Sequence, residues 1–257
     1  MFRKLGLQAY TVRNYFKDEQ SMDELFEKLV AIGYSEIQTA GYESETYARL
    51  AKKHGLSIVG THYNLNEILN NIDATVKLHQ TLGTTNIGVG GCSARTYEEI
   101  MQFVADYNKA AAEYAKYGFK LTYHNHSYEF VKVTEDKSMM DLLVEGFDKD
   151  NVSFVLDTCW VANAGGDVCA WLEKLAGRID ILHLKDLRVT FADEGKWAVQ
   201  QHLCEIGKGN LDWGKILATA EATGVKHIVV EQDRSWIDGD SLKSLEFSKK
   251  YLDQFLA

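Results

Sequence analysis

Proline is absent from this chain of 257 residues, against about 5% in average proteins. Turns must therefore form from the 20 glycines and from Asn and Asp, and slow proline isomerisation cannot limit folding. No apolar run reaches the roughly 18 residues of a membrane helix, and the amino-terminal residues lack the apolar region of a secretory leader. We expect a soluble protein with no membrane partner.

Cysteine and positive charge are also scarce. The four cysteines form no C-x-x-C pair, so the sequence predicts neither a disulfide framework nor a thiolate zinc site, and it fits a reducing cytoplasm. The formal charge is −9, from 28 Lys and Arg against 37 Asp and Glu, and no Lys/Arg-rich block interrupts it. Nucleic acid and anionic membranes are therefore unfavourable partners, and small molecules are favoured.

What the sequence does contain is a repeated alternation of short apolar runs and amphipathic stretches. The apolar runs predict eight strands, at 5–11, 35–40, 56–62, 86–90, from 120, and at 152–157, 179–186 and 226–233. Helical patterns follow them at 21–32, 45–54, 66–82, 96–117, 138–147, 167–176, 212–223 and from 240. Ser21 with Glu24 and Thr96 with Glu99 have the spacing of capping boxes. The chain, residues 1–257, is therefore predicted to be a single-domain (β/α)8 TIM barrel rather than an open sheet.

One connection is longer than ordinary loops. The polar segment 188–210 follows the seventh predicted strand, and we interpret it as a mobile lid over the site. Its GKGN sequence at 207–210 is predicted to be a turn rather than a phosphate-binding loop, because no strand runs directly into it. Asp212, which follows, should cap the next helix.

Four predicted strands deliver a histidine or a carboxylate where their apolar run ends: His124, Asp157, His183 and Glu231. In parallel barrels the carboxyl ends of the strands surround the active site, so these side chains should converge. Side chains alternate along a strand, which places His126 on the same face as His124. A single histidine at a strand end is usually a packing residue, but the joint placement favours a metal site.

Two carboxylates and two imidazoles form a mixed oxygen and nitrogen shell with a net charge of −2. Such a shell suits one divalent cation with positions left for substrate, and Mn, Co, Zn, Fe and Mg all remain candidates. Lys185 could hold a substrate hydroxyl or pair with Asp157, Glu231 or Asp186. The full set of candidates for substrate contact, each of which could instead make local contacts at the barrel rim, is Gln8, Tyr10, Gln38, His62, Trp160 and Lys185.

Six segments resemble, in this order, the sugar phosphate isomerase/epimerase family, with its xylose isomerase-like TIM barrel shared by AP endonuclease family 2: LGLQAYTVR, YHNHSYEF, VLDTCW, LHLKD, IGKGNLDW and VVEQD. The resemblance implies one divalent ion, often manganese, held by Asp157, His183, Glu231 and a fourth residue. That position falls on His124, where the family's metal-binding epimerases have glutamate, and Gln38 stands where many relatives have glutamate. Relatives are often dimers or tetramers, which implies a homo-oligomer as one possibility.

The hypothesis that follows is a metal-dependent isomerase or epimerase acting on a sugar or keto-sugar. Glu231 would take a proton next to the carbonyl, the metal would hold the enediolate, and His126 or His124 would return the proton. The same chemistry permits elimination, so a lyase or dehydratase acting on a 3-keto-glycoside or keto-polyol is the nearest alternative. A non-catalytic sugar-binding subunit and an AP endonuclease are the others, and the acidic chain disfavours the latter.

Overall fold

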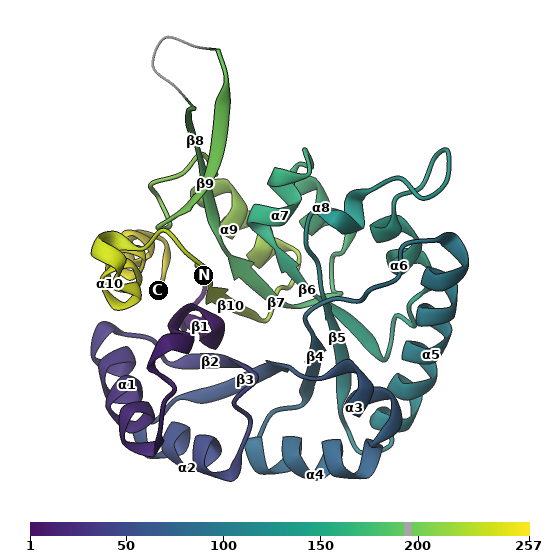
Figure 1. Ribbon diagram of the computed structural model, residues 1–257, viewed down its shortest axis with the longest axis horizontal. Helices are drawn as coiled ribbons and strands as arrows, with labels where there is room; N and C mark the ends of the chain where they lie inside the picture. Colours follow the sequence, from purple (N-terminus) through teal and green to yellow (C-terminus); the bar gives the residue numbers. More distant parts are fainter. Residues whose placement is uncertain (193–196) are drawn as a thin grey trace.

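The computed structural model describes residues 1–192 and 197–257 and shows a nearly closed barrel of eight parallel strands with helices around it (Figure 1). The predicted (β/α)8 barrel is confirmed. Within the described ranges, no helix has both the length and the apolar composition that crossing a bilayer requires. The barrel strands are β1 (Gly6–Gln8), β2 (Glu36–Ala40), β3 (Ser57–His62), β4 (Asn86–Val89), β5 (Lys120–His124), β6 (Val152–Asp157), β7 (Ile179–Leu184) and β10 (His227–Val230).

The barrel closes at a seam between β3 and β4, the two ends of the strand order. Side chains bridge this seam: the Asn86 amide donates to the Val59 carbonyl at 2.9 Å, and the Gly88 N–H donates to the Thr61 hydroxyl at 3.3 Å. The Tyr63 N–H then donates to the Gly88 carbonyl at 2.7 Å. A Cβ atom at Gly88 would lie 2.1 Å from the Thr61 carbonyl oxygen, so only glycine lets the two strands approach this closely.

Amphipathic helices cover the outside of the barrel because each has one apolar face. In α5, for example, Ile100, Phe103 and Tyr107 are buried, and the predicted capping box between Thr96 and Glu99 is present. The helices are α1 (Glu19–Ile32), α2 (Glu45–His54), α3 (Leu65–Asn70), α4 (Ile72–Leu82), α5 (Tyr97–Ala115), α6 (Met139–Gly146), α7 (Thr158–Asn163), α8 (Val168–Lys174), α9 (Trp213–Ala222) and α10 (Ser241–Leu252).

Three local predictions were wrong. The first helix begins after Asp18, whose carboxylate accepts the Ser21 N–H at 2.8 Å, so the capping box pairs Ser21 with Asp18 rather than with Glu24. The helix predicted at 66–82 is two helices, because Asn71 has the non-helical angles φ −126° and ψ 57°. The first strand is shorter than predicted, since a 3-10 helix covers Ala9–Tyr15.

Inside the barrel, an apolar layer of side chains, the floor, lies below the predicted site on the same faces of the strands. It consists of Val59, Val155, Ile181 and Val229, which form a separate buried cluster. Because side chains alternate along a strand, the residue two positions later points into the same interior. On β6, on β7 and directly after β10, those residues are Asp157, His183 and Glu231. The strand pleat therefore delivers these three polar side chains to one level above the floor.

The segment predicted to be a lid contains a β-hairpin. Strands β8 (Asp186–Phe191) and β9 (Val199–Cys204) pair antiparallel and project from the barrel (Figure 1). Residues 193–196 lie outside the described ranges, and movement of the hairpin stays a prediction.

The base of this hairpin is held by the Asp186 carboxylate. One oxygen accepts the N–H groups of Gly207 at 3.0 Å and Gly209 at 3.2 Å, together with the Trp213 indole N–H at 2.8 Å. A Cβ atom at Gly209 would lie 2.1 Å from this carboxylate, so glycine is required where the backbone wraps it. The GKGN segment is a turn, as predicted, and the anion that it surrounds is the Asp186 carboxylate. Asp212 caps α9 through the Lys215 N–H at 3.1 Å, also as predicted.

Replacing Asp186 with alanine is expected to destabilise the protein by about 3 kcal/mol or more, because several N–H donors would lose their partner and each costs about 1–3 kcal/mol when buried. Denaturant unfolding of the two proteins would measure this difference. Glu113→Ala is the matched control, since Glu113 of α5 forms an exposed pair with Lys116 and alanine is a good helix former, and its unfolding midpoint should stay unchanged. A loss below about 1 kcal/mol for Asp186→Ala would contradict the stabilising role of this carboxylate.

Candidate metal centre

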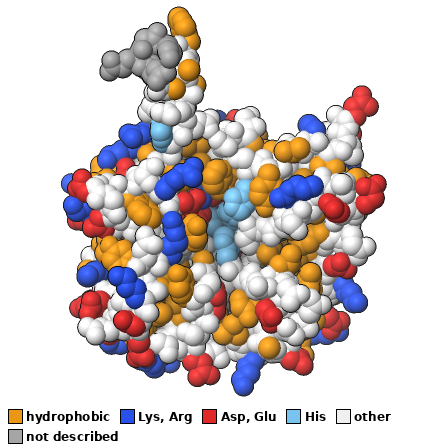
Figure 2. Space-filling view, viewed as in Figure 1, with side chains coloured by type: hydrophobic (Ala, Val, Ile, Leu, Met, Phe, Trp, Pro, Cys, Tyr) orange, Lys and Arg blue, Asp and Glu red, His pale blue; other side chains and the backbone are white. Residues whose placement is uncertain are grey.

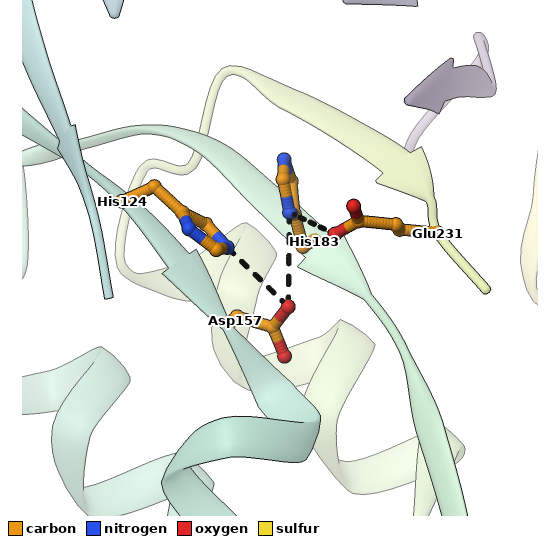
Figure 3. A group of neighbouring side chains, drawn as sticks. All are labelled: His124, Asp157, His183 and Glu231. Atoms are coloured by element: carbon orange, nitrogen blue, oxygen red, sulfur yellow. Dashed lines mark hydrogen bonds and ion pairs between the residues drawn. The ribbon is translucent and has the colours of Figure 1, made fainter. Parts of the chain in front are cut away.

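Four side chains predicted to hold a metal converge at the carboxyl ends of the strands. His124 ends β5, Asp157 ends β6, His183 lies in β7 and Glu231 follows β10 (Figure 3). One ligand atom from each lies within 4.8 Å of the others, and all four residues are buried. Figure 2 shows histidine side chains in the hollow at the centre of this face.

The closest contacts in the group involve His183 and Asp157. The His183 Nδ1 atom lies 2.8 Å from Glu231 Oε2 and 3.7 Å from Asp157 Oδ2. The His124 Nε2 atom lies 3.5 Å from the same Asp157 oxygen. Ligand atoms from four strand ends thus surround one small volume.

The donor set fits a divalent cation. The buried His183 Nδ1 and Glu231 Oε2 atoms lie 2.8 Å apart, so a proton or a metal cation has to lie between them, although Glu231 Oε2 also contacts the Lys185 ammonium at 3.0 Å. Two imidazole nitrogens with two carboxylates suit Zn, Mn, Co or Fe better than Mg, which prefers oxygen ligands. His124, Asp157, His183 and Glu231 are the residues that would hold the ion.

Charged groups around the centre keep its carboxylates ionised. Burial alone would raise the pKa values of Asp157 and Glu231, but the Lys185 ammonium and the neighbouring imidazoles outweigh burial and lower both. For His124, burial is the largest effect and lowers the pKa. The group therefore combines ionised carboxylates with a neutral His124 imidazole. The same carboxylates outweigh burial at His183 and raise its pKa, so a metal ion would compete with a proton there.

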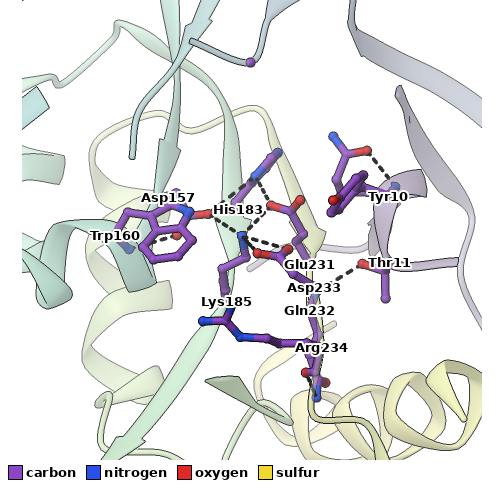
Figure 4. Close-up of polar contacts among 12 residues, drawn as sticks. Tyr10, Thr11, Asp157, Trp160, His183, Lys185, Glu231, Gln232, Asp233 and Arg234 are labelled. Atoms are coloured by element: carbon purple, nitrogen blue, oxygen red, sulfur yellow. Dashed lines mark hydrogen bonds and ion pairs between the residues drawn. The ribbon is translucent and has the colours of Figure 1, made fainter. Parts of the chain in front are cut away.

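Lys185 is fixed by three carboxylates (Figure 4). Its Nζ atom lies 3.4 Å from Asp157 Oδ2, 3.0 Å from Glu231 Oε2 and 3.1 Å from Asp233 Oδ1. The same atom lies 4.9 Å from the centre of the Trp160 ring. The expected pairing with Asp157 or Glu231 is present, whereas Asp186 turns away to bind the loop before α9.

A cavity of about 400 Å³ opens above the centre. This volume is within the range of small-molecule sites. Six residues predicted from the sequence line it: Tyr10, His62, His124, His126, Lys185 and Glu231. The structure adds Asp233, which follows the same strand as Glu231, to the lining of the cavity.

Three other predicted substrate contacts lie beside the cavity rather than in its lining. Gln8 and Gln38 are fully buried, and Gln38 contacts His183 at 2.5 Å. Trp160 lies in α7, and its ring is 5.8 Å from the His126 ring. Their roles in substrate binding stay predictions.

The HNH stretch is held in place by Asn125 and Glu129. Asn125 is buried, and its Oδ1 atom accepts the Asp157 N–H at 3.0 Å, which ties the ends of β5 and β6 together. Glu129 accepts the His126 N–H and the Tyr123 hydroxyl, each at 2.8 Å. The alternation of side chains predicts that Asn125 lies on the face opposite both histidines, but it does not identify the Asp157 N–H as its partner.

The fold and these contacts define a class of protein: an α/β barrel with a candidate metal centre at the carboxyl ends of its strands. The profile of the xylose isomerase-like TIM barrel family matches residues 26–251, and the chain belongs to this family.

Known proteins similar to this chain include enzymes of two kinds. Inosose dehydratase of Clostridium perfringens is 25% identical over 166 residues, which make up 61% of this chain and 55% of that protein. A sugar phosphate isomerase/epimerase from Parabacteroides distasonis has a TM-score of 0.81 at 20% identity, covering 98% of each chain. The IOLI protein with a binding zinc atom has a TM-score of 0.71 at 18% identity, covering 97% of each chain. The two solved structures show a shared fold.

Proposed function

We propose that this protein is a metal-dependent lyase that removes a proton next to the carbonyl of a keto-polyol or keto-glycoside and then eliminates the group on the neighbouring carbon. The observation that carries the proposal is the position of Glu231, which belongs to the four-residue metal centre and also lines the cavity. A carboxylate in this position can reach a substrate atom beside a coordinated carbonyl. The name of the inosose dehydratases, which the chain matches over about half their length, supports elimination.

The proposed reaction balances without a further reactant. Glu231 takes the proton, and the electrons of the C–H bond form the enediolate. These electrons then form the carbon–carbon double bond as the neighbouring C–O bond breaks, and the protonated Glu231 can return its proton to the departing oxygen. When bound, a divalent cation would polarise the carbonyl and stabilise the negative charge on its oxygen, an effect worth several kcal/mol.

The imidazoles that share the cavity with Glu231 favour elimination over epimerisation. Epimerisation needs a second group that returns a proton to the opposite face of the same carbon. Burial lowers the pKa of His126 to about 4 and that of His62 well below its usual value, so both rings are neutral near pH 7. A neutral imidazole is a weak proton donor. Epimerisation remains the second candidate because His126 lines the same cavity as Glu231.

The charges around the cavity favour an uncharged substrate. Asp157, Glu231 and Asp233 would be balanced by the Lys185 ammonium and one divalent cation, which leaves no net charge for a phosphate or carboxylate to neutralise. Arg13, at the rim, already donates to the carbonyls of Tyr10 at 2.7 Å and Asp233 at 3.0 Å. Among the described residues that line the cavity, Lys185 is the only Lys or Arg. Neutral keto-polyols and keto-glycosides are therefore the substrates to test.

Incubating the metal-loaded protein in deuterium oxide with inososes and 3-keto-glycosides is expected to yield a product that has lost water or the glycosidic group, detectable by mass spectrometry. A product of unchanged composition, with deuterium at an inverted carbon, would instead establish epimerisation. Binding of a substrate without product or deuterium incorporation would contradict both reactions and indicate a sugar-binding protein.

A further inference from the structure

A chain of hydrogen bonds, the relay, runs from the backbone of Tyr10 through Gln8 and Gln38 to the candidate metal ligand His183. The Tyr10 N–H donates to Gln8 Oε1 at 3.2 Å. The Gln8 Nε2 group donates to Gln38 Oε1 at 3.0 Å, and the same Gln38 oxygen lies 2.5 Å from His183 Nε2. Both glutamine side chains are fully buried, so water does not compete for these bonds.

The backbone fixes the direction of this chain. A peptide N–H can only donate, so the Gln8 oxygen must face Tyr10 and the Gln8 NH2 group must face Gln38. Gln38 then has to present its oxygen to Gln8. Exchanging the oxygen and the NH2 group of the Gln38 amide would place its NH2 group against the NH2 group of Gln8. Exchanging them in both amides would place the Gln8 NH2 group against the Tyr10 N–H.

The direction of these hydrogen bonds determines which nitrogen of the His183 imidazole carries the proton. Because Gln38 Oε1 can only accept, His183 Nε2 must carry the proton, and in the neutral ring Nδ1 has the free lone pair. This Nδ1 atom faces Glu231 Oε2 at 2.8 Å and Asp157 Oδ2 at 3.7 Å. A lone pair opposite two carboxylates needs a proton or a metal cation between them, and a bound metal ion would take the place of the proton.

We propose that Gln8 and Gln38 are positioning residues that hold His183 in the Nε2–H form, so that Nδ1 is its metal-binding atom. This inference depends on the proposed metal centre but not on the reaction performed there. The relay also branches: Gln8 Nε2 lies 3.4 Å from His62 Nδ1, so the neutral His62 ring carries its proton on Nε2. That buried nitrogen has no hydrogen-bond partner among the described residues and is left as a donor beside the cavity.

Metal affinity of the apo-protein tests the relay without any assay of activity. Gln38→Met keeps the length of the side chain and removes the acceptor, so zinc binding measured by calorimetry should weaken about 10- to 100-fold. Gln38→Glu keeps an acceptor at the same position and should stay within a few-fold of the wild type. Equal affinity of Gln38→Met and the wild type, or equal losses in both variants, would overturn the proposal.

Two further measurements separate positioning from general destabilisation. Thr61→Val removes another buried hydrogen bond, to His79 at 2.9 Å, and should lower thermal stability without changing zinc affinity. In the zinc-loaded wild type, nitrogen NMR of His183 should show a protonated Nε2 and a metal-bound Nδ1, and the reverse assignment would refute the relay. If this assignment holds but no substrate is eliminated, the proposed function fails while the relay stands.

Discussion

Replacing Glu231 with glutamine is expected to reduce both proton exchange and product formation by about 10²- to 10⁴-fold, the usual contribution of one positioned base. Glutamine has nearly the same shape, but its amide cannot accept a proton from carbon. The substitution also removes one carboxylate from the metal centre, where Glu231 Oε2 lies 2.8 Å from His183 Nδ1 and 3.0 Å from Lys185 Nζ. Deuterium incorporation into substrate, followed by mass spectrometry at saturating metal, measures the effect.

The barrel offers a matched control for this experiment. Glu36 is also a buried carboxylate beside an imidazole, with its Oε2 atom 2.9 Å from His227 Nδ1, but both residues begin their strands at the opposite end of the barrel. Glu36→Gln should leave exchange unchanged. Wild-type turnover by Glu231→Gln would remove this residue from the proposed chemistry, and an equal loss in Glu36→Gln would show a general effect on the fold.

The positions of the candidate ligands could be predicted because they follow from two regularities of the chain. Alternation along a strand aligns Asp157 with Val155 and His183 with Ile181, and parallel strands end at one rim. Neither regularity depends on the loops. Strand ends alone therefore sufficed to predict a group that comes from four distant parts of the sequence.

Contacts that depend on side-chain direction could not be predicted in the same way. The sequence placed Gln8 and Gln38 at the rim as candidates for substrate contact, but it does not reveal that their amides meet each other and His183. The hairpin of β8 and β9 was not predicted. Leu187, Val189 and Phe191 alternate with polar residues in β8 and could have identified that strand, whereas β9 is interrupted by polar residues at 200–202. Asp186 was a candidate partner of Lys185. Only the path of the following loop shows that its carboxylate instead accepts hydrogen bonds from backbone N–H groups.

Asp157→Asn is expected to remove high-affinity metal binding while preserving the start of α7. The Asp157 Oδ1 atom accepts the Trp160 N–H at 3.1 Å, and the asparagine oxygen can keep this cap. The amide NH2 group would then face His124, His183 and the Lys185 ammonium, where it offers hydrogens instead of a lone pair. Breaking a buried ionic contact in this way costs about 3–5 kcal/mol, or roughly 10²- to 10⁴-fold in zinc affinity.

Thermal unfolding with and without zinc should separate the two roles of Asp157. The wild type should gain stability from the metal by mass action, whereas Asp157→Asn should gain none at the same zinc concentration. Asp180→Asn is the control, because this buried carboxylate pairs with Lys226 at 3.0 Å at the amino end of β7 and β10, and its response to zinc should match the wild type. If Asp157→Asn bound zinc as tightly as the wild type, the ion would lie elsewhere, since Oδ2 of Asp157 is the atom that both His124 and His183 face.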